Sequence, residues 1–219
     1  MEEKEIHGEL SAIRNLMERS SKFISLSGLS GILAGVYALI GAGVAYKFIA
    51  DNKSEINVFA ENFRLKKTNI GLFYGGDYSA LAEKLFVVAL LVLIFSIGTG
   101  IFLSIDKAKR KGQKIWGPVS RSLLFHMSIP LISGGVLILI LLYRGHYGIV
   151  TPCSLIFYGL ALVSASNFTF NMVKYLGLCE ITLGLIAACL PGYGLLFWAL
   201  GFGVLHIIYG SMMYLKYDR

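Results

Sequence analysis

The chain has 219 residues, of which 56% are hydrophobic and 15% are charged. An ordinary soluble domain carries about 25% charged residues, and the mean hydropathy of this chain is +0.68. These values exclude a disordered chain, a collagen-like chain and a normal soluble domain. They predict an all-α polytopic membrane protein. Three cysteines are too few for a disulfide scaffold.

Six segments are long and apolar enough to cross a bilayer, which requires about 20 residues of helix. Pro130 lies inside the third segment, and Pro152 lies near the start of the fourth. Pro191 and Gly192 separate the last two, which we therefore expect to form a tight helical hairpin. The predicted spans are about 23–50, 85–105, 122–143, 148–167, 173–190 and 193–214.

Residues 1–22 precede the first span and have the apolar spacing of an amphipathic helix. Ile6, Leu10, Ile13 and Met17 recur at intervals of three and four, with charged residues between them. We predict a cytoplasmic helix. It either lies on the membrane or packs on its own bundle, or else it docks a partner or a second copy. Because the segment has no basic n-region and no small-residue cleavage site, we expect the first span to remain as an anchor.

The distribution of Lys and Arg predicts the orientation. The linker 106–121 holds six basic residues and one acid, Asp106, and we place it in the cytoplasm. Both termini then lie on the same side, which carries 13 of the 20 basic residues. We therefore attribute the net charge of +7 to the excess of Lys and Arg on the cytoplasmic side and to contact with anionic lipids, and not to nucleic-acid binding. The expected location is the inner (plasma) membrane of a bacterium.

The segment 51–84 is the only sizeable loop predicted outside the cell. Gly75, Gly76 and Asp77 form a turn signal within it. Ser79 is a possible N-cap, which would start the second helix before its apolar part.

Glycines recur at helical spacing in the first span and in the last hairpin. Small residues on one face let helices approach closely in lipid. We expect them to pack helices within one chain, with a dimer seam along the first span as the alternative. The residues are Gly28, Gly31, Gly35 and Ala42, and the pairs Gly177/Gly184, Gly194/Gly201 and Gly203/Gly210.

Ionisable side chains inside a membrane span are the main functional hint in this sequence. Glu180, His206 and His126 are the candidates for an intramembrane polar site, and Glu180 is the strongest signal. Counted from the cytoplasmic side, all three reach a similar depth of very roughly 8 to 12 Å, so they could share one layer. Such a group could relay protons, bind a cation or hydrogen-bond the helices together.

No metal, cofactor or enzyme motif stands out. Cys153, Cys179 and Cys189 are scattered, and no Cys or His pair has ligand spacing. The sequence lacks HExxH, GxSxG, a phosphate-cradling loop and an acid-rich DxxD motif. We predict no catalytic residues, no cofactor and no metal.

The runs ELSAIRNLMERSSKFISLSGLSGILAGVYALIGA (9–42) and GLLFWALGFGVLHIIYG (194–210) resemble a family of uncharacterised bacterial integral membrane proteins. The resemblance implies a six-span inner-membrane protein and carries no activity with it. The stretch GLCEITLGLIAACLPGYG (177–194) is more loosely similar to the hairpins of HdeD-like acid-resistance membrane proteins. No catalytic residues carry over from either family.

Three classes of function stay open. The first is a non-enzymatic membrane module that acts through a cytoplasmic protein partner or as a homo-oligomer, with residues 1–22 and 106–121 as the contact surface. The second is a small-solute or proton-coupled transporter or channel in which Glu180 titrates. The third is a membrane-embedded, lipid-modifying enzyme, which needs a water-filled cavity that holds Glu180 and a histidine.

Overall fold

The computed structural model describes residues 27–52, 78–110, 112 and 116–218. Every regular element in this part of the chain is helical, and six helices are long and apolar enough to cross a membrane. The predicted all-α, six-span fold is thus confirmed, while the predicted helix 1–22 and most of the loop 51–84 lie outside the described residues. The first five spans are α2 (Gly28–Asp51), α4 (Tyr78–Arg110), α5 (Pro118–Tyr143), α6 (Val150–Ala165) and α7 (Asn171–Cys189).

In the fourth span, short 3-10 turns flank α6 and bring the span to the length of the others. These turns are η1 (Tyr147–Ile149) and η2 (Ser166–Phe168).

The sixth span, which we call the last span, consists of four consecutive helical pieces. They are α8 (Gly194–Trp198), the π-helix η3 (Ala199–Leu205), α9 (His206–Met213) and the π-helix η4 (Tyr214–Asp218).

Two helices extend beyond the predicted spans, so the predicted linker 106–121 is too long. The helix α4 continues through Asp106 to Arg110, where an ion pair of 2.9 Å joins these two side chains. The helix α5 begins at Pro118, because proline suits the first helical turn. The early start of α4 is confirmed, but it begins at Tyr78, and Ser79 lies inside the helix instead of capping it.

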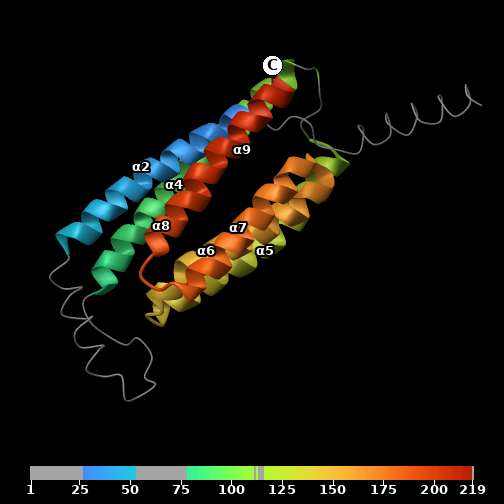
Figure 1. Cartoon of the computed structure of the whole chain (residues 1–219). Helices are drawn as coiled ribbons and strands as arrows, with labels where there is room; N and C mark the ends of the chain where they lie inside the picture. Colours follow the sequence, from blue (N-terminus) through green and yellow to red (C-terminus); the bar gives the residue numbers. More distant parts are fainter. Residues whose placement is uncertain (1–26, 53–77, 111, 113–115, 219) are drawn as a thin grey trace, which may run out of the picture.

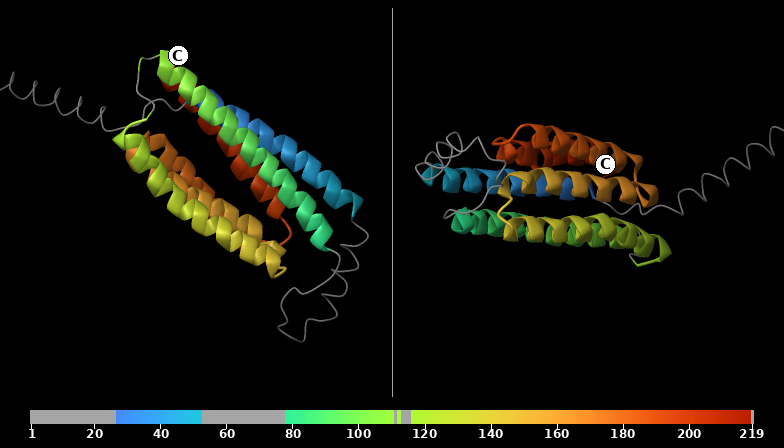
Figure 2. Two further views of the ribbon diagram at one scale, coloured as in Figure 1. Left: turned by 180° about the vertical axis from the view of Figure 1, so that it is seen from behind. Right: turned by 90° about the horizontal axis from the view of Figure 1, so that it is seen from below.

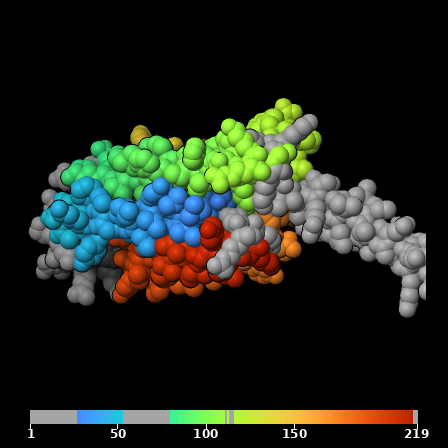
Figure 3. Space-filling view, turned by 90° about the horizontal axis from the view of Figure 1, so that it is seen from above, coloured from blue at the N-terminus to red at the C-terminus, as the bar shows by residue number. Residues whose placement is uncertain are grey.

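The six spans form two layers of three helices that face each other (Figures 1 and 2). The first layer contains α4, α2 and the last span, which lie side by side on one face of the molecule (Figure 3). The second layer contains α5, α6 and α7. The layers touch mainly where α6 and α7 meet the last span, and we call this interface the seam.

Glycines hold helices together within each layer, as the sequence predicted. In the first layer, a Cβ atom on Gly35 would lie 2.6 Å from the carbonyl oxygen of Gly203. In the second layer, a Cβ on Gly159 would lie 2.6 Å from the carbonyl oxygen of Gly177. Backbones at this separation leave no room for a side chain. Packing within one chain is therefore confirmed for the glycines of the first span.

The hairpin between α7 and the last span also has the predicted form. Gly192 has a φ of +96°, a conformation that residues with a side chain rarely adopt. Pro191 precedes it and cannot continue α7. The turn returns the chain directly into the seam, so that α7 and the last span lie next to each other.

Candidate functional site

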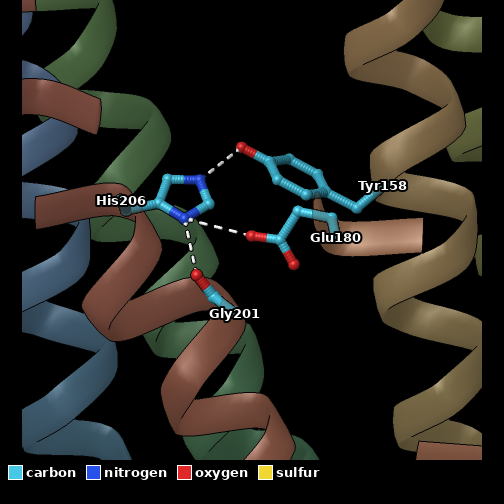
Figure 4. A network of polar contacts seen from close by, with 4 residues as sticks. All are labelled: Tyr158, Glu180, Gly201 and His206. Carbon is cyan, nitrogen blue, oxygen red and sulfur yellow. Dashed lines mark hydrogen bonds and ion pairs between the residues drawn. The ribbon is translucent and has the colours of Figure 1, made fainter. Parts of the chain in front are cut away.

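Three polar side chains meet at the seam, in the middle of the membrane spans. Glu180 lies nine residues from each end of α7, or about 14 Å along the helix. Tyr158 and His206 are also close to the midpoints of their spans, 147–168 and 194–216. Tyr158 and Glu180 belong to the second layer and His206 to the first, so the cluster joins the two layers (Figure 4).

The imidazole of His206 has a partner on each ring nitrogen. Its Nε2 lies 2.8 Å from the hydroxyl of Tyr158, and its Nδ1 lies 3.0 Å from the carbonyl oxygen of Gly201. Because a carbonyl only accepts, Nδ1 carries a hydrogen and donates it to Gly201. In the neutral ring, Tyr158 then donates to Nε2; in the charged ring, Nε2 donates to the oxygen of Tyr158. The site can hold either form of the imidazole without losing a hydrogen bond.

Glu180 is the unsatisfied member of the cluster. Its side chain has no exposed surface, and neither carboxyl oxygen has a hydrogen-bond partner among the described residues. The imidazole of His206 lies beside the carboxyl, with its Nδ1 3.5 Å from Oε1. A buried polar atom without a partner costs free energy that the rest of the fold must offset. This buried carboxyl without a hydrogen-bond partner is therefore the candidate functional group of the cluster.

The last span departs from an α-helix where it meets Glu180. The π-helical segment η3 contains Gly201 and ends one residue before His206. A Cβ on Gly201 would lie 2.5 Å from Oε2 of Glu180 and 2.6 Å from Leu155. Because Gly201 has no side chain, the carboxyl can lie directly against the backbone of the last span. Single π-turns inside helices are often found at functional sites.

The structure brings together two of the three predicted site residues. Glu180 and His206 lie at a similar depth in their spans, as the sequence predicted, although this depth is the middle of the spans and greater than expected. His126 is not part of the cluster. Its side chain is exposed on α5, and its ring stacks on Phe168 at a centroid distance of 4.9 Å. Because α5 touches only the elements of its own layer extensively, His126 does not reach the seam.

The sequence prediction missed Tyr158 and the role of Gly201. A tyrosine in the middle of an apolar span was a usable signal, because a buried hydroxyl usually has a hydrogen-bond partner. The sequence showed that Gly201 lies seven residues after Gly194. Spacing along one helix, however, does not reveal which residue of a neighbouring helix contacts the glycine. The π-helical segment has no signature in the sequence that we can identify.

Within the described residues, no three His, Cys, Asp or Glu side chains gather in a way that could hold a metal ion. Comparisons of the chain with family models, with curated proteins and with solved structures found no match. The chemistry available to the site is therefore argued from its own groups. A carboxyl and an imidazole that face each other at 3.5 Å can hold one proton or two.

Proposed function

We propose that this protein is a proton-coupled carrier of a small solute in the inner membrane of a bacterium, with Glu180 as the group that gains and loses the proton. One observation carries the proposal: a carboxyl without a hydrogen-bond partner lies next to an imidazole, at mid-membrane, between two helical layers. Ionisable residues in this position are expensive, and they mark proton and ion pathways. Coupling sites of many transporters lie near the bilayer midplane between two structural units.

The buried position of Glu180 fits a closed state of such a carrier. A group without exposed surface exchanges no proton with water until the surrounding helices move. The seam is the natural place for this movement, because the helices contact each other much less across it than within each layer. Parting at one end and then at the other would expose Glu180 alternately to the two sides of the membrane.

The charges at the helix ends support an orientation with both termini in the cytoplasm. Six of the nine described basic residues lie toward the end of the bundle that holds the C-terminus, and excess Lys and Arg mark the cytoplasmic side. These residues also provide contact with anionic lipid headgroups. They are Lys107, Lys109, Arg110, Arg121, Lys174 and Lys216.

The same basic end supports a second candidate, a non-enzymatic module that acts through a cytoplasmic partner or as a homo-oligomer. This function needs the surface formed by residues such as Lys109 and Arg121, and it does not need a titrating Glu180. It predicts that charge reversal at the basic end abolishes the biological activity while Glu180→Gln leaves it intact. The reverse pattern favours the carrier.

Proton movement in proteoliposomes tests the carrier. A pH-sensitive dye inside the vesicles reports proton entry when a pH gradient is imposed, with and without small solutes in the external buffer. We expect the wild-type protein to move protons and the Glu180→Gln variant to lose this movement. Glu83→Gln is the matched control, because Glu83 is exposed near the start of α4. Equal proton entry in the wild type and in Glu180→Gln, with both proteins folded, overturns the proposal.

A further inference from the structure

A row of aromatic rings leads from the outer part of the last span to the site. Trp198, Phe202 and His206 follow one another at intervals of four and therefore share one face of the helix. The ring centroids of Trp198 and Phe202 are 5.5 Å apart, and those of Phe202 and His206 are 6.1 Å apart. Tyr158 approaches the row from α6, with its centroid 5.1 Å from that of Phe202. The rings thus come from both layers.

The row ends at the one carboxyl in the seam that has no hydrogen-bond partner. Glu180 contacts His206, and His206 contacts both Phe202 and Tyr158. When Glu180 loses its proton while His206 is neutral, an unpaired charge is left in a region of low dielectric constant, and a bound cation can neutralise it. The aromatic row shows which kind of cation this surface favours.

A metal ion does not suit these surroundings. Ca²⁺ binds about six to eight oxygen ligands and Mg²⁺ about six, but the Glu180 carboxyl lies beside the Gly201 backbone and the His206 ring, with no oxygen-ligand set around it among the described residues. Aromatic faces instead attract organic cations, whose charge is spread over an apolar surface and which lose little hydration energy on burial. An anionic carboxylate beside several aromatic rings is a suitable partner for an amine, a quaternary ammonium or a phosphonium ion.

We propose that the seam binds a hydrophobic organic cation, which pairs with ionised Glu180 and lies against the rings of Trp198, Phe202 and Tyr158. This inference rests on the proposed function and names the class of its solute: the cation takes the place of the proton on Glu180, and the proton leaves. The titratable groups that face Glu180 from the packed elements are His206 on the last span and Tyr158 on α6. Tyr209 lies close enough to Tyr158 to interact with it electrostatically. The cation binds while His206 is neutral.

The closed seam requires the layers to part before the cation enters. Even a Cβ atom on Gly201 would lie 2.5 Å from Glu180 and 2.6 Å from Leu155, so the space beside the carboxyl does not admit a larger group in this conformation. Glu180 loses its proton to water only after the seam has parted, and the carboxylate that forms then pairs with the cation in the open state. Proton release and cation entry are then two parts of one exchange.

Binding of tritiated tetraphenylphosphonium to the full chain in lipid nanodiscs tests this proposal. The probe carries a permanent charge, and tetraphenylborate is a control of the same shape with the opposite charge. A dye in weakly buffered solution measures proton release in the same sample. We expect saturable binding of the phosphonium with release of a proton, no saturable binding of the borate, and loss of both signals in Glu180→Gln.

Two further variants test the aromatic contacts. Trp198→Leu combined with Phe202→Leu should weaken phosphonium binding by about tenfold, whereas Phe102→Leu, on the exposed surface of α4, should leave it unchanged. If protons move in a Glu180-dependent way but the phosphonium does not bind, this inference is overturned, while the proposed proton-coupled function is not affected. Phosphonium binding that survives Glu180→Gln also overturns it. Binding that depends on Glu180 without any proton release supports the cation site and overturns the exchange with a proton.

Discussion

The carboxyl group of Glu180 occupies the space that a side chain on Gly201 would need. A Cβ atom on Gly201 would lie 2.5 Å from Oε2, and the Gly201 carbonyl accepts the hydrogen bond from His206. Gly201 therefore does two things at once: it admits the carboxyl and orients the imidazole. The site depends on a residue that has no side chain, which explains why its chemistry is hard to see from the residue types alone.

Replacement of Gly201 by alanine should displace Glu180 and destabilise the protein. The added methyl group meets both Glu180 and Leu155, and overpacking of this kind costs about 1–3 kcal/mol. Thermal unfolding of the purified variant measures the loss. Gly135→Ala is the matched control, because nothing lies within 4 Å of a Cβ at that position in α5. An unfolding temperature for Gly201→Ala equal to that of the control would contradict the described contact.

The hydrogen bond between Tyr158 and His206 should appear as a coupling between the two layers. Tyr158→Phe removes the hydroxyl, and His206→Asn keeps a donor near the position of Nδ1 while it removes Nε2. A double-mutant cycle on the free energy of unfolding in mixed micelles should give a coupling of about 0.5–1.5 kcal/mol. If the two substitutions change the free energy of unfolding additively, this 2.8 Å contact does not hold the layers together.

Two glycines of α2 should respond in opposite ways to the same substitution. Gly35→Val should prevent close packing of α2 on the last span, because the Cβ would meet the Gly203 backbone at 2.6 Å. Gly43→Val should be tolerated, since nothing lies within 4 Å of its Cβ position. The yield of monodisperse protein after detergent extraction compares the two variants. If Gly35→Val instead leaves folding intact and dissociates an oligomer, α2 is a dimer seam and not an internal contact.

Much of the fold can be predicted from the sequence, because membrane spans follow from length and hydropathy alone. The internal packing of Gly28 and Gly35 was also predictable, since small residues at helical spacing allow close approach. The meeting of Glu180 with His206 followed from their similar depth. The depth argument failed for His126, because depth does not tell which helices are neighbours: α5 lies in the second layer with its histidine turned outward.

Other parts of the site were not predictable for physical reasons. The π-helical turn at Gly201 depends on what the neighbouring helix places against it, and no local residue pattern specifies this. Tyr158 acts through a contact with His206, which is 48 residues away in the sequence and belongs to another span. Such pairings are set by three-dimensional packing, which hydropathy and spacing do not describe.

A fusion at the C-terminus tests the orientation. In the proposed orientation, the end of the bundle near the C-terminus faces the cytoplasm because it carries the excess of basic charge. A C-terminal green fluorescent protein should therefore fluoresce, and a C-terminal alkaline phosphatase should be inactive. Active phosphatase and dark fluorescent protein would invert the proposed topology.

The central claim is that Glu180 gains and loses a proton in the membrane, and infrared difference spectroscopy measures this directly. Spectra of the purified protein in lipid are recorded over a pH series and compared with those of Glu180→Gln, with Glu83→Gln as the control carboxyl variant. The account predicts a carboxyl band that is absent from Glu180→Gln, unchanged in Glu83→Gln, and reversibly lost as the pH is raised. A Glu180 band that keeps the same intensity at every pH would contradict the account. Glu180 would then be a permanent structural acid, and the basic end of the bundle would be the place to look for function.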